Sequence, residues 1–460
     1  MKIELAKSEV IHFVGIGGIG MSGMAELLSN LGHVITGSDM LESNRTRHLM
    51  DLGLEIKIGH SESNIKDHDL VVYSSAVSED NSEIQKSRNL NIPVIKRAEM
   101  LGELLKVKNN SIAVAGTHGK TTTSSMLNSI LTSSGDKPTL IVGGIVQDIL
   151  SNSILGEGDT IIVEADEYDR TLLSLNASMS IVTNIDYEHS DCYDSLDSLK
   201  ETFLTFINST SFYGINVICY DDPNIKSIVS DIKRPFLKYG KSAECDIRYE
   251  NPSFNQNESS FDLIIGNQNY GKFKLNVPGE HNILNSLAAI GVALELNIPI
   301  DLIKEGIYDY KGVKRRFEIK HRTKNNIIVV DDYAHHPSEI DATINAAKSG
   351  WDINKLIIVF QPHLYSRTQE FQKEFSRVLS KADIVMLTEI YPAREKEVQG
   401  VSSELILNDL KCNSSSILSM SKIPLKVADV CSENDMIIIM GAGDIRNVTD
   451  EICNAIKDIK

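Results

Sequence analysis

Residues 113–123 read AVAGTHGKTTT, and this stretch decides how the middle of the chain is expected to fold. An apolar run precedes it and the helix-like segment SSMLNSILTSSG follows it, so the pattern predicts a strand, a tight turn and a helix. The P-loop pattern G-x-x-x-x-G-K-[ST] would place its first glycine at position 114, where this chain has Val114. Gly116 and Gly119 still let backbone amides wrap a phosphate. We therefore expect a nucleotide site with ATP as its occupant; the alternative is a chance GKT in a turn.

The side chains of this loop suit a triphosphate. Lys120 is placed to reach the terminal phosphates, and the hydroxyl of Thr121 is placed to ligate Mg²⁺. The residues expected at the ATP phosphates are Gly116, Thr117, His118, Gly119, Lys120, Thr121 and Thr122.

A second glycine loop, VGIGGIG at residues 14–20, lies near the start of the chain. The pattern G-x-G-x-x-G is formed by Gly15, Gly17 and Gly20, with Gly18 between them, and it directly follows a predicted strand. Asp39 ends the next predicted strand, where an acidic side chain could accept hydrogen bonds from a ribose. Alone, the pattern fits NAD, FAD or a nucleotide sugar equally, or a turn without a ligand. Two nucleotide loops in separate domains favour a transfer between two phosphorylated substrates.

Bulk composition limits the class of protein. The chain has 460 residues, 42% hydrophobic and 24% charged, with a formal net charge of -17. That charge argues against a nucleic-acid partner. Six scattered cysteines predict free thiols, and the lack of a signal peptide or a long apolar run predicts a cytoplasmic protein without membrane insertion.

The order of apolar runs predicts an α/β fold with mostly parallel sheets in three domains. Residues 1–106 are expected to form an N-terminal Rossmann-like domain and residues 107–315 a central P-loop ATPase-like domain with a mostly parallel sheet. Residues 316–460 are expected to form a C-terminal Rossmann-like α/β domain. About residues 233–277 we expect an antiparallel appendage.

Acidic and polar groups follow several strands of the central domain. Glu164 ends the strand DTIIVEAD, where it suits a Mg²⁺ shared with Thr121, and His189 lies in the next acidic cluster, TNIDYEHSD. A solvated strand end and a capping histidine are the alternatives. Asn282 and Asn285 lie three apart on one helix, where amides bond an adenine edge or a phosphate, although Asn282 also suits a helix N-cap. Arg316 belongs to a basic turn that is either functional or merely solvated.

Two dense clusters mark strand ends in the third domain. VVDDYAHHPSEI brings together Asp332, His335 and His336, and FQPHLYSRTQEF supplies His363, Tyr365 and Arg367. These groups suit an amino-acid substrate, with Arg367 at its carboxylate and a histidine beside its amine.

The order of these motifs resembles the Mur ligase family of peptidoglycan synthesis. FVGIGGIGMSGMAELL, SSAVSEDN, AGTHGKTTT, EADEYD, TNIDYEHSD, PGEHNILN, KRRFE, DDYAHHPSE and FQPHLYSRT occur in the family's order over essentially the whole chain, and the family's AGTHGKTT-like loop accounts for Val114. The last two motifs resemble the alanine-adding branch. The resemblance implies an ATP- and Mg²⁺-dependent ligase that joins L-alanine to the lactyl carboxylate of UDP-N-acetylmuramate through an acyl phosphate, as a monomer or homodimer.

The resemblance also implies roles for single residues. Lys120 would contact the ATP phosphates, while Thr121, Glu164 and His189 would hold or support the metal. Asn282 and Asn285 would lie at the nucleotide, Arg316 at its phosphates, and Asp332 near the hinge and ribose. The residues implied at the UDP-sugar are Gly15, Gly17, Gly18, Gly20, Asp39, Ser74 and Ser75.

Two residues depart from the family pattern, and other functions remain open. Tyr168 stands where the alanine branch is expected to have serine, and Glu280 where related sequences carry arginine. Tyr168 is also typical of the relative that attaches a recycled tripeptide to the same sugar. An NAD-linked nucleotide-sugar dehydrogenase and a non-catalytic nucleotide-binding regulator are more distant alternatives. For the ligase, His335, His336 or Asp332 is the candidate base for the amine, and domain closure is expected about residues 311–316.

Overall fold

The computed structural model of the protein describes residues 9–146, 151–188, 192–393, 395–457 and 459. The chain divides into two compact units. Unit 1 comprises Met1–Asn251, Asp262–Phe273 and Leu284–Tyr310, and unit 2 comprises Pro252–Phe261, Lys274–Ile283 and Lys311–Lys460.

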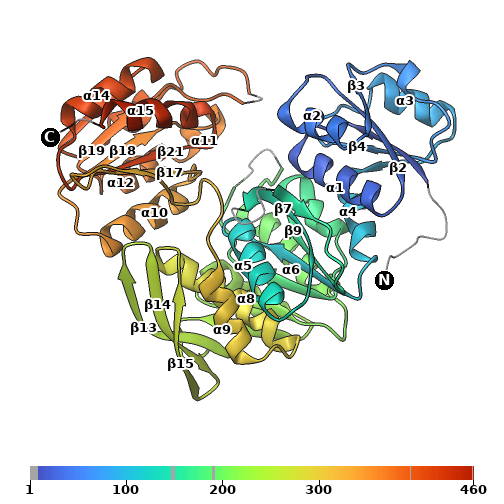
Figure 1. Ribbon diagram of the computed structural model, residues 1–460, viewed down its shortest axis with the longest axis horizontal. Helices are drawn as coiled ribbons and strands as arrows, with labels where there is room; N and C mark the ends of the chain where they lie inside the picture. The colour runs from blue at the N-terminus through green and yellow to red at the C-terminus, as the bar shows by residue number, and fades with distance from the viewer. Residues whose placement is uncertain (1–8, 147–150, 189–191, 394, 458, 460) are drawn as a thin grey trace. The chain divides into compact units, whose positions relative to one another are not determined.

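The N-terminal part of unit 1 is a parallel sheet with the strand order β3-β2-β1-β4-β5, drawn in blue in Figure 1. Its strands are β1 (Val10–Val14), β2 (Val34–Asp39), β3 (Glu55–Ile58), β4 (Leu70–Tyr73) and β5 (Val94–Lys96). The helices that connect them are α1 (Ile19–Asn30), α2 (Asn44–Asp51), α3 (Ser82–Asn89) and α4 (Arg97–Leu105), with the 3₁₀ turn η1 (Glu62–Asn64). The order reverses between β1 and β4, which is where open α/β sheets bind ligands at the carboxyl ends of the strands.

A ten-stranded sheet forms the middle of the chain, in the order β15-β14-β13-β12-β11-β10-β6-β9-β7-β8. Strands β6 to β13 pair in parallel apart from β8, which is antiparallel to β7. The bounds are β6 (Asn110–Ala115), β7 (Thr139–Val146), β8 (Ser151–Ile154), β9 (Thr160–Ala165), β10 (Met179–Val182), β11 (Asn216–Cys219), β12 (Phe236–Gly240), β13 (Ile247–Asn255), β14 (Glu258–Ile265) and β15 (Gln268–Leu275).

The antiparallel part of this sheet is smaller than the sequence predicted. β13, β14 and β15 are neighbours joined only by residues 256–257 and 266–267, and strands with such short connections run antiparallel. β12, which falls within the predicted appendage, instead pairs in parallel with β11. Its alternating apolar residues did not reveal the direction of pairing.

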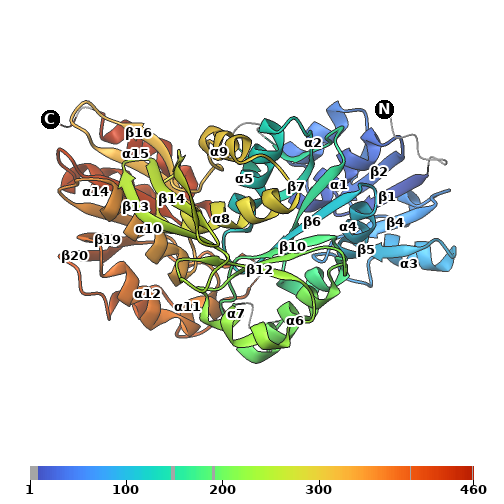
Figure 2. The ribbon, with the colours of Figure 1, turned by 90° about the horizontal axis from the view of Figure 1, so that it is seen from below.

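Helices cover both faces of the middle sheet. Figure 2 shows α6 and α7 on one side and α5, α8 and α9 on the other. Their bounds are α5 (Lys120–Ser133), α6 (Leu196–Ser209), α7 (Pro223–Ile228), α8 (Glu280–Glu295) and α9 (Ile300–Asp309), with the 3₁₀ segments η2 (Tyr168–Ser174) and η3 (Val229–Asp231). α5 and α9 pack closely, because a Cβ placed on Gly306 would lie 2.4 Å from the Cα of Ile130.

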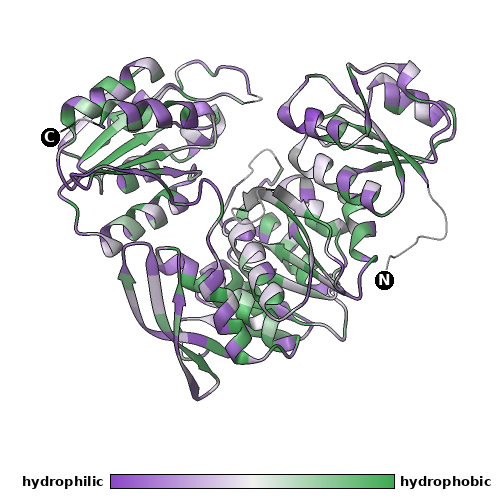
Figure 3. Cartoon of the chain, viewed as in Figure 1, coloured by the Kyte–Doolittle hydropathy of each residue, from purple (hydrophilic) through white to green (hydrophobic). Residues whose placement is uncertain are grey.

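The C-terminal sheet has the order β16-β17-β21-β18-β19-β20, and only the β16–β17 pair is antiparallel. Strand residues alternate between two cores: Val330 lies in one and Val329 in the other. Both faces are therefore apolar, and β18 and β21 are green in Figure 3. The strands are β16 (Glu318–Arg322), β17 (Ile328–Asp332), β18 (Leu356–Phe360), β19 (Ile384–Leu387), β20 (Ser414–Ile417) and β21 (Met436–Met440).

The helices of this part are short except for the first. They are α10 (Pro337–Gly350), α11 (Tyr365–Glu370), α12 (Gln372–Leu379), α13 (Glu404–Leu407), α14 (Ile423–Val430) and α15 (Thr449–Ala455), with the 3₁₀ turns η4 (Met420–Lys422) and η5 (Asp444–Val448). The prediction of three α/β parts with mostly parallel sheets is confirmed. Among the described residues, no helix combines the length and apolar character needed to span a bilayer.

Candidate active site

The loop at residues 116–119 connects β6 to α5 in unit 1. Val114 is a fully buried residue of β6, so the turn begins only at Gly116. Gly116 and Gly119 have φ values of +133° and +83°, and Gly119 is the N-cap of α5. A Cβ would lie 2.0 Å from Oγ1 of Thr183 at Gly116, and 2.6 Å from Oδ1 of Asn285 at Gly119. The backbone angle and the close neighbours both require glycine here.

The segment that follows β10 holds this loop in place. Asn184 accepts from the amide of His118 at 2.8 Å and donates to its carbonyl at 3.0 Å. The hydroxyl of Thr117 donates to the carbonyl of Asp186 at 3.1 Å and accepts from its amide at 2.9 Å. Nε2 of His118 lies 3.3 Å from Oδ2 of Asp186. The loop is therefore preorganised, which lowers the entropic cost of ordering it around a phosphate.

Lys120 is folded into the loop. Its Nζ donates to the carbonyls of Gly116 at 2.6 Å and Thr117 at 3.2 Å, and to Oε2 of the buried Glu167 at 2.7 Å. Burial alone would lower the pKa of Lys120, but the negative charge of Glu167, followed by Asp166 and Glu164, raises it above its ordinary value. The ammonium is therefore a fixed positive charge at the mouth of the loop.

Glu164 ends β9, as the sequence predicted. Its Oε2 accepts from the amide of Gly143 at 2.9 Å, whereas its Oε1 is buried and has no hydrogen-bond partner among the described residues. Burial raises the pKa of this carboxyl, opposed by Thr121, the Gly143 amide and the charge of Lys120. A buried, unsatisfied carboxylate oxygen beside a threonine hydroxyl matches the oxygen donors that Mg²⁺ prefers. The residues present therefore fit the predicted metal.

Two outcomes of the sequence predictions concern this neighbourhood. His189 lies outside the described residues. The sequence analysis assigned no role to Glu167, although this residue lies in the motif EADEYD. Lys120 and Glu167 are far apart in the sequence, so the sequence pattern did not predict their ion pair.

The start of α8 carries the predicted asparagines. Oδ1 of Asn285 lies against Gly119, as described above, and both asparagines are buried. Nδ2 of Asn282 donates to the carbonyl of Pro278 at 2.7 Å, within the first turn of α8 rather than at its N-cap. Between Glu280 and Asn282, the sequence reasoning missed His281 in unit 2. Burial, followed by the charge of Arg316, lowers the pKa of His281 to about 4, so this imidazole is neutral at physiological pH.

In unit 2, Glu339 connects the predicted basic turn at Arg316 with the predicted cluster that contains His335. Its Oε1 accepts from Nη1 of Arg316 at 3.0 Å, and its Oε2 accepts from the amide of His335 at 3.1 Å. Nδ1 of His335 lies 2.9 Å from the carbonyl of Tyr333 and 3.1 Å from Oε2 of Glu339. Both neighbours of Nδ1 are acceptors, so the neutral ring carries its proton on Nδ1 and its lone pair on Nε2.

Asp332 is buried at the end of β17, where it supports the backbone. Oδ2 accepts from the amide of Phe317 at 2.9 Å and from the hydroxyl of Thr343 at 3.2 Å, and Oδ1 accepts from the amide of Ala334 at 2.7 Å. Phe317 and Arg315 have φ values of +48° and +60°, which non-glycine residues rarely adopt. Burial raises the pKa of Asp332 to about 6, against the charge of Arg316 and the backbone bonds. In this structure Asp332 stabilises the strained segment that was predicted to be the hinge.

The second predicted cluster of unit 2 meets the first. The ring centroids of His335 and His363 are 5.9 Å apart, and Nη1 of the buried Arg367 donates to Nδ1 of His363 at 3.2 Å. The amide of Tyr365 donates to Oε2 of Glu395 at 2.6 Å. His336 is the N-cap of α10, and its Nδ1 accepts from the amide of Ser338 at 3.4 Å. The carboxyl ends of β17 and β18 thus bring together the predicted amino-acid-binding residues.

The N-terminal glycine loop follows β1. Gly15 has a φ of +79°, and the amides of Gly15 and Ile16 donate to the carbonyl of Ser38 at 2.8 and 3.0 Å. Asp39 accepts from the amide of Gly17 at 2.8 Å through Oδ2 and from the amide of Leu41 at 3.2 Å through Oδ1. The predicted ribose acceptor therefore supports the glycine loop in this structure.

The remaining N-terminal predictions lie beside this loop. A Cβ on Gly20 would lie 2.8 Å from Nη1 of Arg97, whereas at Gly18 it would make only ordinary contacts. The hydroxyl of Ser74 accepts from the amide of Ala76 at 3.3 Å, and Ser75 is exposed.

Comparisons with known proteins cover nearly the whole chain. Three family models match in order: the Mur ligase family catalytic domain at residues 10–109, the Mur ligase middle domain at 114–293, and the Mur ligase, glutamate ligase domain at 315–443. A UDP-N-acetylmuramate--L-alanine ligase of Trichlorobacter lovleyi is 45% identical over 95% of this chain and 96% of its own. The corresponding protein of Geotalea daltonii is 44% identical over 98% of this chain and 99% of its own.

Solved structures of related ligases have a similar fold. A UDP-N-acetylmuramate-alanine ligase of Thermotoga maritima superposes with a TM-score of 0.80 at 31% identity, covering 97% of this chain and 98% of that one. A murein peptide ligase of Psychrobacter arcticus, at 24% identity and a TM-score of 0.69, covers 98% of this chain and 100% of that one and shares the fold. Because three Mur ligase models match in order along the chain and relatives are 44–45% identical over nearly its full length, the chain belongs to the Mur ligase family.

Proposed function

We propose that the protein is an ATP-dependent ligase that joins L-alanine to the lactyl carboxylate of UDP-N-acetylmuramate in peptidoglycan precursor synthesis. The observation that carries the proposal is the loop at residues 116–120, with Lys120 held beside Glu167 and with the unsatisfied oxygen of Glu164 nearby. The high identity to alanine ligases over the full chain supports the choice of substrates.

The chemistry follows from the inertness of a carboxylate, which is anionic and has no good leaving group. Transfer of the γ-phosphoryl group of ATP to the lactyl carboxylate gives an acyl phosphate and ADP. The amine of alanine then attacks the acyl carbon, the tetrahedral intermediate expels phosphate, and an amide remains. One ATP is thereby converted to ADP and phosphate for each amide bond.

Positive charges of the chain support the first step. The ammonium of Lys120 and the guanidinium of Arg316 are proposed to stabilise charge on the transferring phosphoryl group. Thr121 and Glu164, with His189, would hold the Mg²⁺, which would supply positive charge to offset the negative charge of the phosphate groups. This proposal includes the domain closure predicted about residues 311–316, because the sugar nucleotide, ATP and the amino acid are each expected on a different domain.

The second step needs a neutral amine, and the amino-acid cluster supplies a base. The inferred tautomer of His335 carries its lone pair on Nε2, which is the form that accepts a proton. We propose His335 as this base, with His336 and Asp332 as alternatives, and His363, Tyr365 and Arg367 as the binding groups for the amino acid.

A coupled assay tests the proposal. Phosphate release should require UDP-N-acetylmuramate, ATP and an amino acid together, and L-alanine should support it better than glycine, L-serine or the recycled tripeptide. Lys120→Met should abolish release. Activity with the tripeptide but not with alanine would favour the tripeptide alternative, which rests on Tyr168. Release that needs neither the sugar nor an amino acid would refute the ligase.

A further inference from the structure

Glu83 is a fully buried carboxylate in the first turn of α3 that no step of the proposed reaction uses. Its Oε1 accepts from Nδ2 of Asn64 at 2.6 Å and from the amide of Ser61 at 3.2 Å. Its Oε2 accepts from the hydroxyl of Ser38 at 2.5 Å and lies 3.2 Å from Nδ1 of His60. The Asn64 amide, the Ser61 amide and the Ser38 hydroxyl all donate to it, and an ionised carboxylate has acceptor sites for all three.

One of these donors belongs to the residue that holds the glycine loop. The hydroxyl of Ser38 binds Glu83, while the carbonyl of the same residue accepts from the amides of Gly15 and Ile16. The amide of Gly59, next to His60, donates to the carbonyl of Asp39 at 2.8 Å. Glu83 thus helps to fix the end of β2 against the glycine loop through Ser38.

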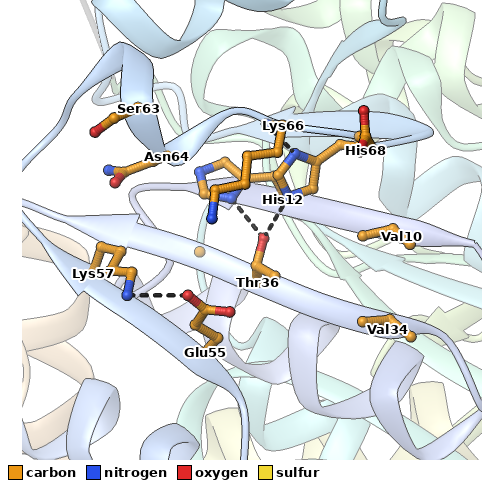
Figure 4. A pocket seen from close by; sticks show the side chains of 12 residues that line it. Val10, His12, Val34, Thr36, Glu55, Lys57, Ser63, Asn64, Lys66 and His68 are labelled. Carbon is orange, nitrogen blue, oxygen red and sulfur yellow. Dashed lines mark hydrogen bonds and ion pairs between the residues drawn. The ribbon is translucent and has the colours of Figure 1, made fainter.

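A directional hydrogen-bond chain runs from His68 through Thr36 to His12 along a cavity of about 320 Å³ on the sheet face, which Figure 4 shows with these three side chains. The amide of Lys66 can only donate, so Nδ1 of His68, at 3.1 Å, accepts. In the neutral ring Nε2 then donates to Thr36 at 3.0 Å, and Thr36 donates to Nδ1 of His12 at 2.7 Å. Nε2 of His12, which then carries the ring's remaining proton, lies 3.6 Å from Oε2 of Glu83, beyond hydrogen-bond distance. The N–H of His12 thus faces the Glu83 carboxylate as an electrostatic neighbour and adds no further hydrogen bond to it.

We propose that Glu83 is a positioning residue for the sugar-nucleotide substrate. Its carboxylate orients Ser38, and the carbonyl of Ser38 binds the amides of Gly15 and Ile16, which fixes the start of the glycine loop that is proposed to receive the diphosphate of UDP-N-acetylmuramate. This inference rests on the proposed function, which places that substrate at the loop.

The isosteric variant Glu83→Gln tests the inference sharply. Glutamine keeps the shape but turns one acceptor oxygen into a donor that faces other donors, so Ser38 or Asn64 loses its partner. We expect the KM for UDP-N-acetylmuramate to rise about tenfold, the effect of one or two lost hydrogen bonds, with kcat and the KM values for ATP and alanine unchanged. Ser38→Ala should have a similar effect, and the double variant should be little worse than either, because both act through one contact.

The matched control is Glu79→Gln, a neighbouring carboxylate that is exposed and paired with Arg88 at 3.1 Å. It should leave every KM unchanged. Calorimetric titration with UDP alone reads the loop without the ligase reaction, so loss of the proposed reaction and loss of the Glu83 effect are distinguishable. If Glu83→Gln does not fold, Ser38→Ala carries the test. A wild-type protein that binds no UDP, or variants whose KM values for all three substrates rise together, would overturn the inference.

Discussion

The two ends of α5 offer a comparison that separates backbone strain from steric exclusion in the phosphate loop. Gly119 and Gly135 flank this helix, with φ values of +83° and +88°. A Cβ on Gly119 would meet Oδ1 of Asn285 at 2.6 Å, whereas a Cβ on Gly135 would meet nothing within 4 Å. Alanine at the two positions therefore carries the same conformational cost and differs in the contact.

The magnitudes follow from these geometries. A left-handed alanine costs about 1–2 kcal/mol, and the stiffer unfolded chain returns about 0.4–1 kcal/mol, so Gly135→Ala should lower the free energy of unfolding by about 1 kcal/mol. Gly119→Ala must also displace the buried amide of Asn285, which adds about 1–3 kcal/mol. We expect a total near 3 kcal/mol, together with a KM for ATP raised at least about tenfold by the displaced loop.

Urea unfolding and phosphate-release kinetics measure both effects. Gly135→Ala should leave the KM for ATP unchanged. Adding Asn285→Ala to Gly119→Ala should recover part of the lost stability, because it removes the atom in conflict. Equal destabilisation by the two glycine variants, or an unchanged KM for ATP in Gly119→Ala, would refute the reasoning.

Three further predictions concern buried carboxylates. Glu164→Gln should raise the Mg²⁺ concentration needed for half-maximal phosphate release without lowering the melting temperature, because burial already penalises the charge; an unchanged Mg²⁺ requirement would contradict the metal role. Glu339→Gln leaves Arg316 without its buried partner and should lower the free energy of unfolding by about 2 kcal/mol in urea titration, whereas the exposed Glu404→Gln should not. For Glu83, burial raises the pKa, but interactions led by His12 and Ser38 lower it to about 2, below the ordinary 4.5. The ionised Glu83 carboxylate therefore contributes up to about 3 kcal/mol to the free energy of unfolding. This contribution is present in full above pH 4.5 and is lost as the pH falls towards 2. In melting curves recorded at several pH values, the stability difference between wild type and Glu83→Gln should shrink between pH 4.5 and pH 2.

Much of the fold followed from local patterns. Apolar runs ending in glycine or acidic residues predicted the strands before α1 and α5 and those that deliver Glu164 and Asp332, because parallel strands buried on both faces are continuously apolar. The direction of β12 did not follow, since pairing direction depends on neighbours far away in sequence.

Candidate site residues could be predicted where they lie close together in the sequence. Gly116, Gly119 and Lys120 lie within one turn, and their spacing revealed the loop. The ion pairs of Glu167 with Lys120 and of Glu339 with Arg316 were missed because the partners are distant in sequence, although Glu339 also contacts the nearby His335. For Asp39, the position at the end of β2 predicted a ribose contact, which stays a prediction, and the pattern did not reveal that both of its oxygens accept backbone amides.

The ion pair between Lys120 and Glu167 also bears on chemical selectivity. The proposed reaction generates an acyl phosphate, an electrophile that acylates any accessible amine. Because the neighbouring carboxylates raise the pKa of Lys120, its nitrogen holds three hydrogens and has no lone pair to attack with. The enzyme thereby keeps its own lysine inert towards the intermediate it stabilises, and the substrate amine is left as the competent nucleophile.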